Sequence, residues 1–227
     1  ACGRAQPPPL QATLLATLPP ICPTPDGLAI DADGQLVVAC PNYMDQAKPA
    51  CLVKVNPTSL AVTPWVDVPV LAETGVSCPM GIDFGPDGDL YVCDNQAWKG
   101  TPQGQFKGRL LRLKIQGNRV ARTTVVAEGM EHPNGVRVHK GFLYVTQSLM
   151  SKVKDPSGLM LSAVYRFPAD ASAIRVGNTL SDPNILATFL TENRFCQYGS
   201  DGLVFDSKGN LFVGNFGDGK LYKLTFD

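Results

Sequence analysis

The sequence predicts an all-β protein, and two observations carry that prediction. The first is composition: 22 glycines and 19 prolines among 227 residues interrupt the chain too often for long helices and favour short strands joined by turns. The second is a motif that occurs four times, in which one residue and a glycine precede two apolar runs separated by a tight turn. The copies begin at Pro25, Pro79, Pro133 and Ser200.

Each copy predicts a β-hairpin, because its two short apolar runs flank a turn that contains glycine. The turns are Asp33-Gly34, Asp87-Gly88, Lys140-Gly141 and Lys208-Gly209. A third strand is predicted after every hairpin, at residues 51–56, 109–115, 163–168 and 220–226. A fourth strand is predicted after the first three hairpins, at 63–68, 123–128 and 184–190. Insertions rich in glycine, proline, serine and lysine predict loops at 96–108, 148–161 and 169–182.

Four-stranded units repeated around an axis are the blades of a β-propeller. The sequence therefore predicts one four-bladed propeller domain over residues 11–227, with residues 1–10 as a disordered or trimmed segment. No fourth strand follows the last copy, whereas a strand-like run at 11–18 precedes the first copy. We expect residues 11–18 to pair with 220–226 and close the ring. The alternative is a six-bladed propeller that is cut after the third strand of a blade.

Charge and motifs exclude several classes of function. Lys+Arg and Asp+Glu both number 20, so the chain lacks the basic excess that a nucleic-acid groove normally shows. The longest apolar runs are about five residues, whereas a membrane-spanning helix needs about 20. The sequence contains no G-x-S-x-G elbow, H-E-x-x-H motif or P-loop. We therefore expect neither a nucleic-acid partner nor a membrane span.

Seven cysteines favour an oxidising compartment, and we expect a secreted, periplasmic or extracellular protein. Cys40 and Cys51 lie at the two ends of a ten-residue loop between strand-like runs, so they are predicted to form a disulfide across the hairpin mouth. The alternative is that several cysteines are free, buried, small apolar residues. The pairing of the others stays open: Cys2, Cys22, Cys78, Cys93 and Cys196.

The third and fourth copies carry the family resemblance. Pro133-Asn134-Gly135 with its LYV run, followed one blade later by Asp201-Gly202, resembles the senescence marker protein / gluconolactonase / luciferin-regenerating enzyme-like propellers from about residue 20 onward. The resemblance implies that Asp26, Asn134 and Asp201 ligate one divalent cation, usually calcium, at the top of the channel. It also implies that Asp201 is the general base in lactone hydrolysis. Met80 stands where the family often has a substrate-contacting asparagine.

A physical argument stands beside the resemblance. Two carboxylates that converge without lysine or arginine repel each other, and a hard cation with oxygen ligands removes that repulsion. Such an ion polarises a carbonyl group and lowers the pKa of a bound water. The alternative is that these aspartates and the asparagine cap backbone amides in their turns and bind nothing. Seven further side chains are candidates for substrate contact: Asn42, Asp94, Asn95, Gln147, Ser148 and Asn215 at the ends of the second strands, and His132 before the third motif.

The sequence thus predicts a divalent-cation-dependent hydrolase that acts on a lactone or a related ester. The main alternative is a non-catalytic secreted propeller that binds a protein, a glycan or its own copies. A lyase or synthase of the strictosidine-synthase-like kind is a third and weaker alternative.

Overall fold

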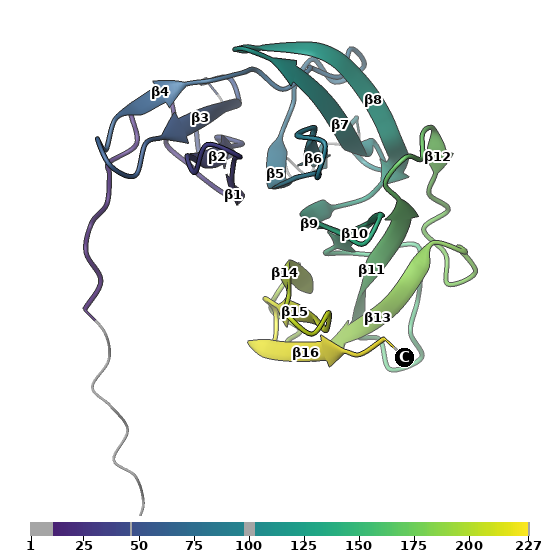
Figure 1. Cartoon of the computed structure of the whole chain (residues 1–227). Coiled ribbons are helices and arrows are strands. Elements are labelled where there is room, and N and C mark those ends of the chain that lie inside the picture. The colour runs from purple at the N-terminus through teal and green to yellow at the C-terminus, as the bar shows by residue number, and fades with distance from the viewer. Residues whose placement is uncertain (1–10, 46, 98–102, 227) are drawn as a thin grey trace, which may run out of the picture.

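The computed structural model describes residues 11–45, 47–97 and 103–226. These residues form strands β1 to β16, arranged in four small sheets that follow one another along an arc (Figure 1). The sheets are the four blades of a β-propeller, which confirms the predicted fold class. Within the described ranges, no helix is long and apolar enough to cross a membrane. Residues 1–10, predicted as a disordered or trimmed segment, lie outside the described residues.

Within each sheet, strands that are consecutive in the sequence are antiparallel neighbours. The first sheet contains β1 (Leu28–Ile30), β2 (Leu36–Cys40), β3 (Cys51–Val55) and β4 (Val62–Pro64). The second contains β5 (Pro79–Phe84), β6 (Leu90–Asp94), β7 (Gly108–Gln116) and β8 (Arg119–Met130). The third contains β9 (Pro133–His139), β10 (Phe142–Gln147), β11 (Met160–Pro168) and β13 (Ile185–Thr191). The fourth contains β14 (Ser200–Phe205), β15 (Leu211–Asn215) and β16 (Lys220–Leu224).

Every predicted hairpin is present and supplies the first two strands of a sheet. The turn glycines adopt positive φ values between 75° and 82°, a conformation that glycine reaches at no steric cost: Gly34, Gly88, Gly141 and Gly209. The predicted third and fourth strands are also present, with bounds that shift by a few residues. The sequence did not predict one strand, β12 (Ile174–Arg175). This strand lies in the predicted loop 169–182 and pairs in parallel with the outer strand β8.

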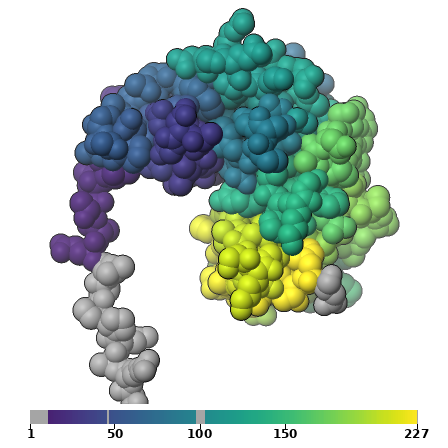
Figure 2. Space-filling view, viewed as in Figure 1, coloured from purple at the N-terminus to yellow at the C-terminus, as the bar shows by residue number. Residues whose placement is uncertain are grey.

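The predicted closure of the ring is wrong. Residues 11–18 form no strand, and β16 is the last strand of a three-stranded fourth sheet. Instead, Ala16 and Leu18 pack against buried side chains on one face of the first sheet, Val38 and Val53 among them. Ala16 and Leu18 are thus partly buried against the first blade, whereas Leu14 and Leu15 are exposed. The arc stays open between the first and fourth sheets (Figures 1 and 2).

The predicted Cys40–Cys51 disulfide is also wrong. The two residues are direct cross-strand partners on β2 and β3, as expected from the hairpin. Nevertheless, neither of them is bonded in a disulfide. The Cys51 Sγ atom lies 3.5 Å from the Sγ atom of Cys22, whereas a disulfide bond is about 2.05 Å long. The thiol of Cys22 therefore lies beside the two cysteines that were predicted to pair.

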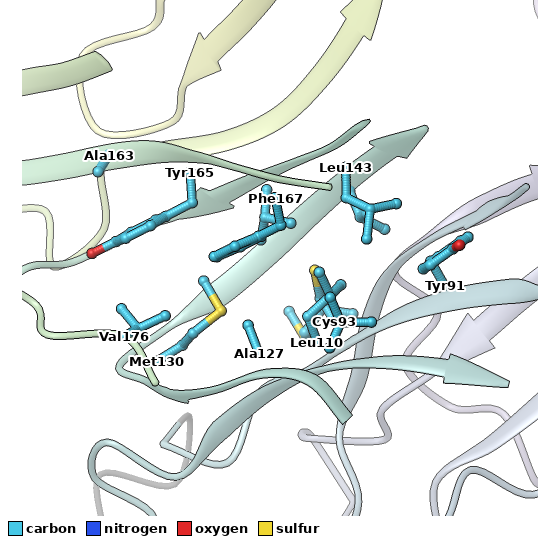
Figure 3. Close-up of a cluster of buried hydrophobic side chains, with 14 of the residues drawn as sticks. Tyr91, Cys93, Leu110, Ala127, Met130, Leu143, Ala163, Tyr165, Phe167 and Val176 are labelled. Carbon is cyan, nitrogen blue, oxygen red and sulfur yellow. The ribbon is translucent and has the colours of Figure 1, made fainter. Parts of the chain in front are cut away.

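Adjacent sheets pack face to face and bury apolar side chains between them. The largest cluster lies between the second and third sheets, where aromatic and aliphatic side chains of both interlock (Figure 3), among them Tyr91, Leu110, Leu143, Tyr165 and Phe167. Similar clusters join the first sheet to the second and the third sheet to the fourth. This stacking fixes the angle between blades and so fixes where their inner strands meet.

Glycine in the repeated motif allows neighbouring inner strands to approach closely. A Cβ atom on Gly27 would lie 2.2 Å from the carbonyl oxygen of Met80, and one on Gly81 would lie 2.4 Å from that of Asn134. A Cβ atom on Gly135 would lie 2.8 Å from the carbonyl oxygen of Asp201. Each of these three glycines therefore accommodates the backbone of the next motif residue, which brings the four motif residues together at the axis.

This packing predicts a sharp difference between two glycines of the same motif. Gly81→Ala should lower the free energy of unfolding by about 1–3 kcal/mol, because the new methyl group meets backbone rather than a movable side chain. Gly202→Ala is the matched control, because a Cβ atom there meets nothing within 4 Å. Urea unfolding of both variants measures the difference, and equal destabilisation would contradict the packing argument.

Candidate functional site

A cavity of about 340 Å³ lies where the inner strands meet. It is lined by all four motif residues and by six further side chains: Asp26, Met80, Asn134 and Asp201, together with Tyr43, Asn95, His132, Ser148, Tyr198 and Phe216. The four motif residues come from four different blades, as the repeat predicts. A second cavity, of about 320 Å³, lies beside Asn42 and Asp67 and contains no motif residue. The axial cavity is therefore the candidate site.

The two carboxylates of the site are hard to ionise together. Loss of hydration raises the pKa of Asp26 to about 6, and the negative charge of Asp201 adds to that shift. Burial also raises the pKa of Asp201. Asp26 lies on the exposed rim and Asp201 is half-buried, but among the described residues neither lysine nor arginine lines the cavity to neutralise them. The site therefore has unsatisfied negative charge when both groups are ionised.

The raised pKa of Asp26 predicts a pH dependence of stability in the absence of divalent cations. The folded state holds the Asp26 proton up to about pH 6, whereas the unfolded state releases it near pH 4. The free energy of unfolding should therefore fall as pH rises from about 4 to 6. In Asp26→Asn this fall should be smaller, as measured by melting temperatures in chelator-treated buffers.

The control for this prediction is Asp33→Asn, which replaces an exposed aspartate in the first hairpin turn. That variant should keep the full pH dependence of the wild type. If Asp26→Asn and wild type follow the same profile, Asp26 does not carry the destabilising charge.

His132 enters the site as a neutral imidazole with a defined tautomer. Burial lowers its pKa to about 4, so the ring is uncharged at neutral pH. The backbone N–H of Ala97 donates to Oδ1 of Asn95 at 3.1 Å, which turns the Asn95 amide nitrogen toward His132. That nitrogen lies 3.0 Å from Nδ1 of His132 and donates to it. The proton of the ring therefore sits on Nε2, which makes this nitrogen a hydrogen-bond donor.

Ser148 brings a second polar group to the cavity. Its side chain is buried, and among the described residues its Oγ atom has no hydrogen-bond partner. A buried hydroxyl without a partner costs free energy, and the known explanations for such a group include a catalytic role and a bound water or ion. Ser148 and the neutral His132 give the cavity two uncharged donors near its two carboxylates.

Four of the predicted substrate-contact residues do not line the cavity. Asp94 is fully buried and accepts hydrogen bonds from Nε of Arg109 at 2.8 Å and from the backbone N–H of Cys78 at 2.7 Å. The Oε1 atom of Gln147 accepts from the backbone N–H of Glu131 at 2.9 Å. The other two also hold backbone or side chains in place: Asn42 donates to the carbonyls of Ile21 and Pro49, and Asn215 bonds to Thr191 and to the N–H of Asp218.

A regular offset explains which side chains reach the cavity. In each blade the residue at or just beyond the end of the second strand anchors a loop, and the next residue lines the cavity. The lining residues are Tyr43, Asn95, Ser148 and Phe216, each one position after Asn42, Asp94, Gln147 and Asn215. Successive side chains along extended backbone point in opposite directions. The repeat alone would have identified Tyr43 and Phe216, because each occupies the same position in its blade as Asn95 and Ser148. Tyr198 was missed because it lies outside the repeated hairpins.

No protein-family model matches the sequence, and no match is found among the curated proteins. A solved structure described as a gluconolactonase aligns with a TM-score of 0.52 at 14% identity, covering 88% of this chain and 57% of that one. One from Thermus thermophilus, described as an oxidoreductase (glucose dehydrogenase), aligns with a TM-score of 0.60 at 17% identity, covering 89% and 61%. A gluconolactonase from Xanthomonas campestris aligns with a TM-score of 0.49 at 17% identity, covering 88% and 60%.

The chain thus spans about 60% of the length of these solved structures. At such low identity the likeness concerns the β-propeller fold alone.

Proposed function

We propose that the axial cavity binds a divalent cation, calcium by preference, and hydrolyses a lactone or a related ester. One observation carries the proposal: two carboxylates with raised pKa values and one amide converge from three blades in a cavity whose lining, over the described part of the chain, has no cationic side chain. A cation is the simplest partner for this set of oxygen donors. The fold, which is shared with a protein described as a gluconolactonase, agrees with this chemistry.

Asp26, Asn134 and Asp201 are the residues that would hold the cation. Carboxylate and amide oxygens are ligands that calcium prefers, and water completes its shell of six to eight. When bound, the ion supplies positive charge that polarises the carbonyl group of an ester. The remaining chemistry belongs to side chains of this protein.

Asp201 would act as the general base. Its carboxylate accepts a proton from the attacking water while the water oxygen forms a bond to the carbonyl carbon. The ring C–O bond then breaks, and the same proton passes to the leaving oxygen, so the product is a hydroxy acid. His132 through Nε2–H and Ser148 through its hydroxyl donate hydrogen bonds to substrate oxygens.

The rest of the lining suits a small ring. Met80, Tyr43, Tyr198 and Phe216 give the cavity apolar and aromatic surface, and its volume is at the lower end for small-molecule sites. We expect a substrate of about the size of a sugar lactone, with its hydroxyl groups turned toward the polar side chains.

A lactone panel with and without calcium tests the proposal. The wild-type protein should hydrolyse at least one sugar lactone or small ester, lose that activity in chelator and regain it with calcium, as followed by acid release. Calcium should also raise the melting temperature of the wild type by mass action. If calcium stabilises the protein but nothing is hydrolysed, a binding protein with a structural ion is the better interpretation.

A further inference from the structure

Three buried thiols converge on one face of the first sheet. The Sγ atoms of Cys22, Cys40 and Cys51 all lie within 4.8 Å of one another. Cys40 and Cys51 are opposed on β2 and β3, while Cys22 comes from the segment that precedes β1 and lies in a turn closed by its own N–H to the carbonyl of Pro19 at 2.8 Å. This cluster lies outside the axial cavity, because none of its members lines that cavity.

The spacing of the sulfurs fits a single metal ion. An ion about 2.3 Å from three sulfurs in one plane places those sulfurs about 4 Å apart. The measured Cys22–Cys51 separation of 3.5 Å and the limit of 4.8 Å for the set bracket that value. Binding of a metal ion therefore needs only small movements of three cysteine side chains that already lie close together.

The apolar surroundings and the three sulfur ligands favour a soft metal ion with a low coordination number. The cluster is packed among Val38, Val53 and Val55, with Leu18 against it, so water has little access. In the described part of the chain, no histidine, carboxylate or fourth cysteine joins the three sulfurs. Zinc in a structural site takes four ligands, whereas thiolates in small number suit monovalent copper.

Metal binding would displace the thiol protons of the cluster, as it does in other thiolate sites.

We propose that Cys22, Cys40 and Cys51 form a binding site for one thiophilic metal ion, with Cu(I) as the preferred occupant. The ion would clip the segment before β1 to the first sheet. Because Cys22 precedes Asp26 by four residues, the clip would also fix the path by which the chain reaches the axial cavity. The site does not depend on the proposed lactone chemistry.

Titration with Cu(I) against a coloured chelator, on reduced protein under argon, tests the site. We expect one equivalent to bind to the wild type and to raise its melting temperature. Cys22→Ser should weaken binding by at least tenfold and abolish the thermal shift. Cys22 lies outside every strand, so this variant should keep its fold, which circular dichroism without metal verifies.

Cys196→Ser is the matched control, because Cys196 is a free thiol remote from the cluster in sequence and donates to the carbonyl of Tyr198. It should bind Cu(I) as the wild type does. Absence of uptake by the wild type, or equal uptake by wild type and Cys22→Ser, overturns the proposal. Protein isolated under argon without reductant that carries a Cys22–Cys51 or Cys40–Cys51 disulfide overturns it as well.

Discussion

Replacing Asp201 by asparagine should lower the rate of lactone hydrolysis by about 10²–10⁴-fold, the usual contribution of a positioned general base. The amide keeps one oxygen that can ligate a cation, but it cannot accept a proton from the attacking water. Binding of calcium should therefore persist in weakened form while turnover is lost. The loss should fall on kcat, because the proton moves only in the transition state.

Two further variants give this experiment its controls. Asp206→Asn changes a partly exposed aspartate in the hairpin turn of the same blade and should leave turnover unchanged. Asp26→Asn removes a ligand charge but no base, so raising the calcium concentration should restore part of its activity. Full turnover in Asp201→Asn would remove Asp201 from the chemistry, and equal rescue of both variants by calcium would make it only a ligand.

The repeated motif made most of the architecture predictable. Its turn positions require a positive φ, and most of its inner positions lie too close to a neighbouring backbone for a side chain. Both requirements select glycine, so both can be recognised in the sequence. Because the four copies occupy equivalent places, the repeat alone was enough to predict that Asp26, Asn134 and Asp201 share a cavity.

Other features depend on packing that the local sequence does not encode. An apolar run such as residues 11–18 can pair as a strand or cover a sheet face, and only the three-dimensional contacts of Ala16 and Leu18 decide between them. The spacing of Cys40 and Cys51 located the hairpin mouth but could not reveal that the Sγ atom of Cys22 lies 3.5 Å from that of Cys51. Asn42 was predicted to contact substrate because it follows the second strand, but its backbone adopts a positive φ of 54° and its side chain donates to the carbonyls of Ile21 and Pro49.

Asp94→Ala should lower the free energy of unfolding by about 3–5 kcal/mol, the cost of leaving a buried charge without its partner. The carboxylate is fully buried, and the Arg109 side chain that it pairs with is 9% exposed. Asp94 also accepts from the backbone N–H of Cys78 and from Nε2 of Gln96 at 2.9 Å, so the variant removes an acceptor from three residues. Urea unfolding measures the loss.

Asp87→Ala is the matched control for this buried pair, because Asp87 pairs with Arg112 at the surface and its side chain is 48% exposed. An exposed pair contributes about 0–1 kcal/mol, so this variant should remain close to wild type. Replacing both buried partners, as in Asp94→Leu/Arg109→Met, should recover part of the stability that Asp94→Ala loses, since no unpaired charge then remains. If Asp94→Ala is no less stable than Asp87→Ala but impairs lactone hydrolysis, Asp94 belongs to the substrate site after all, and the anchoring role that its hydrogen bonds assign to it is wrong.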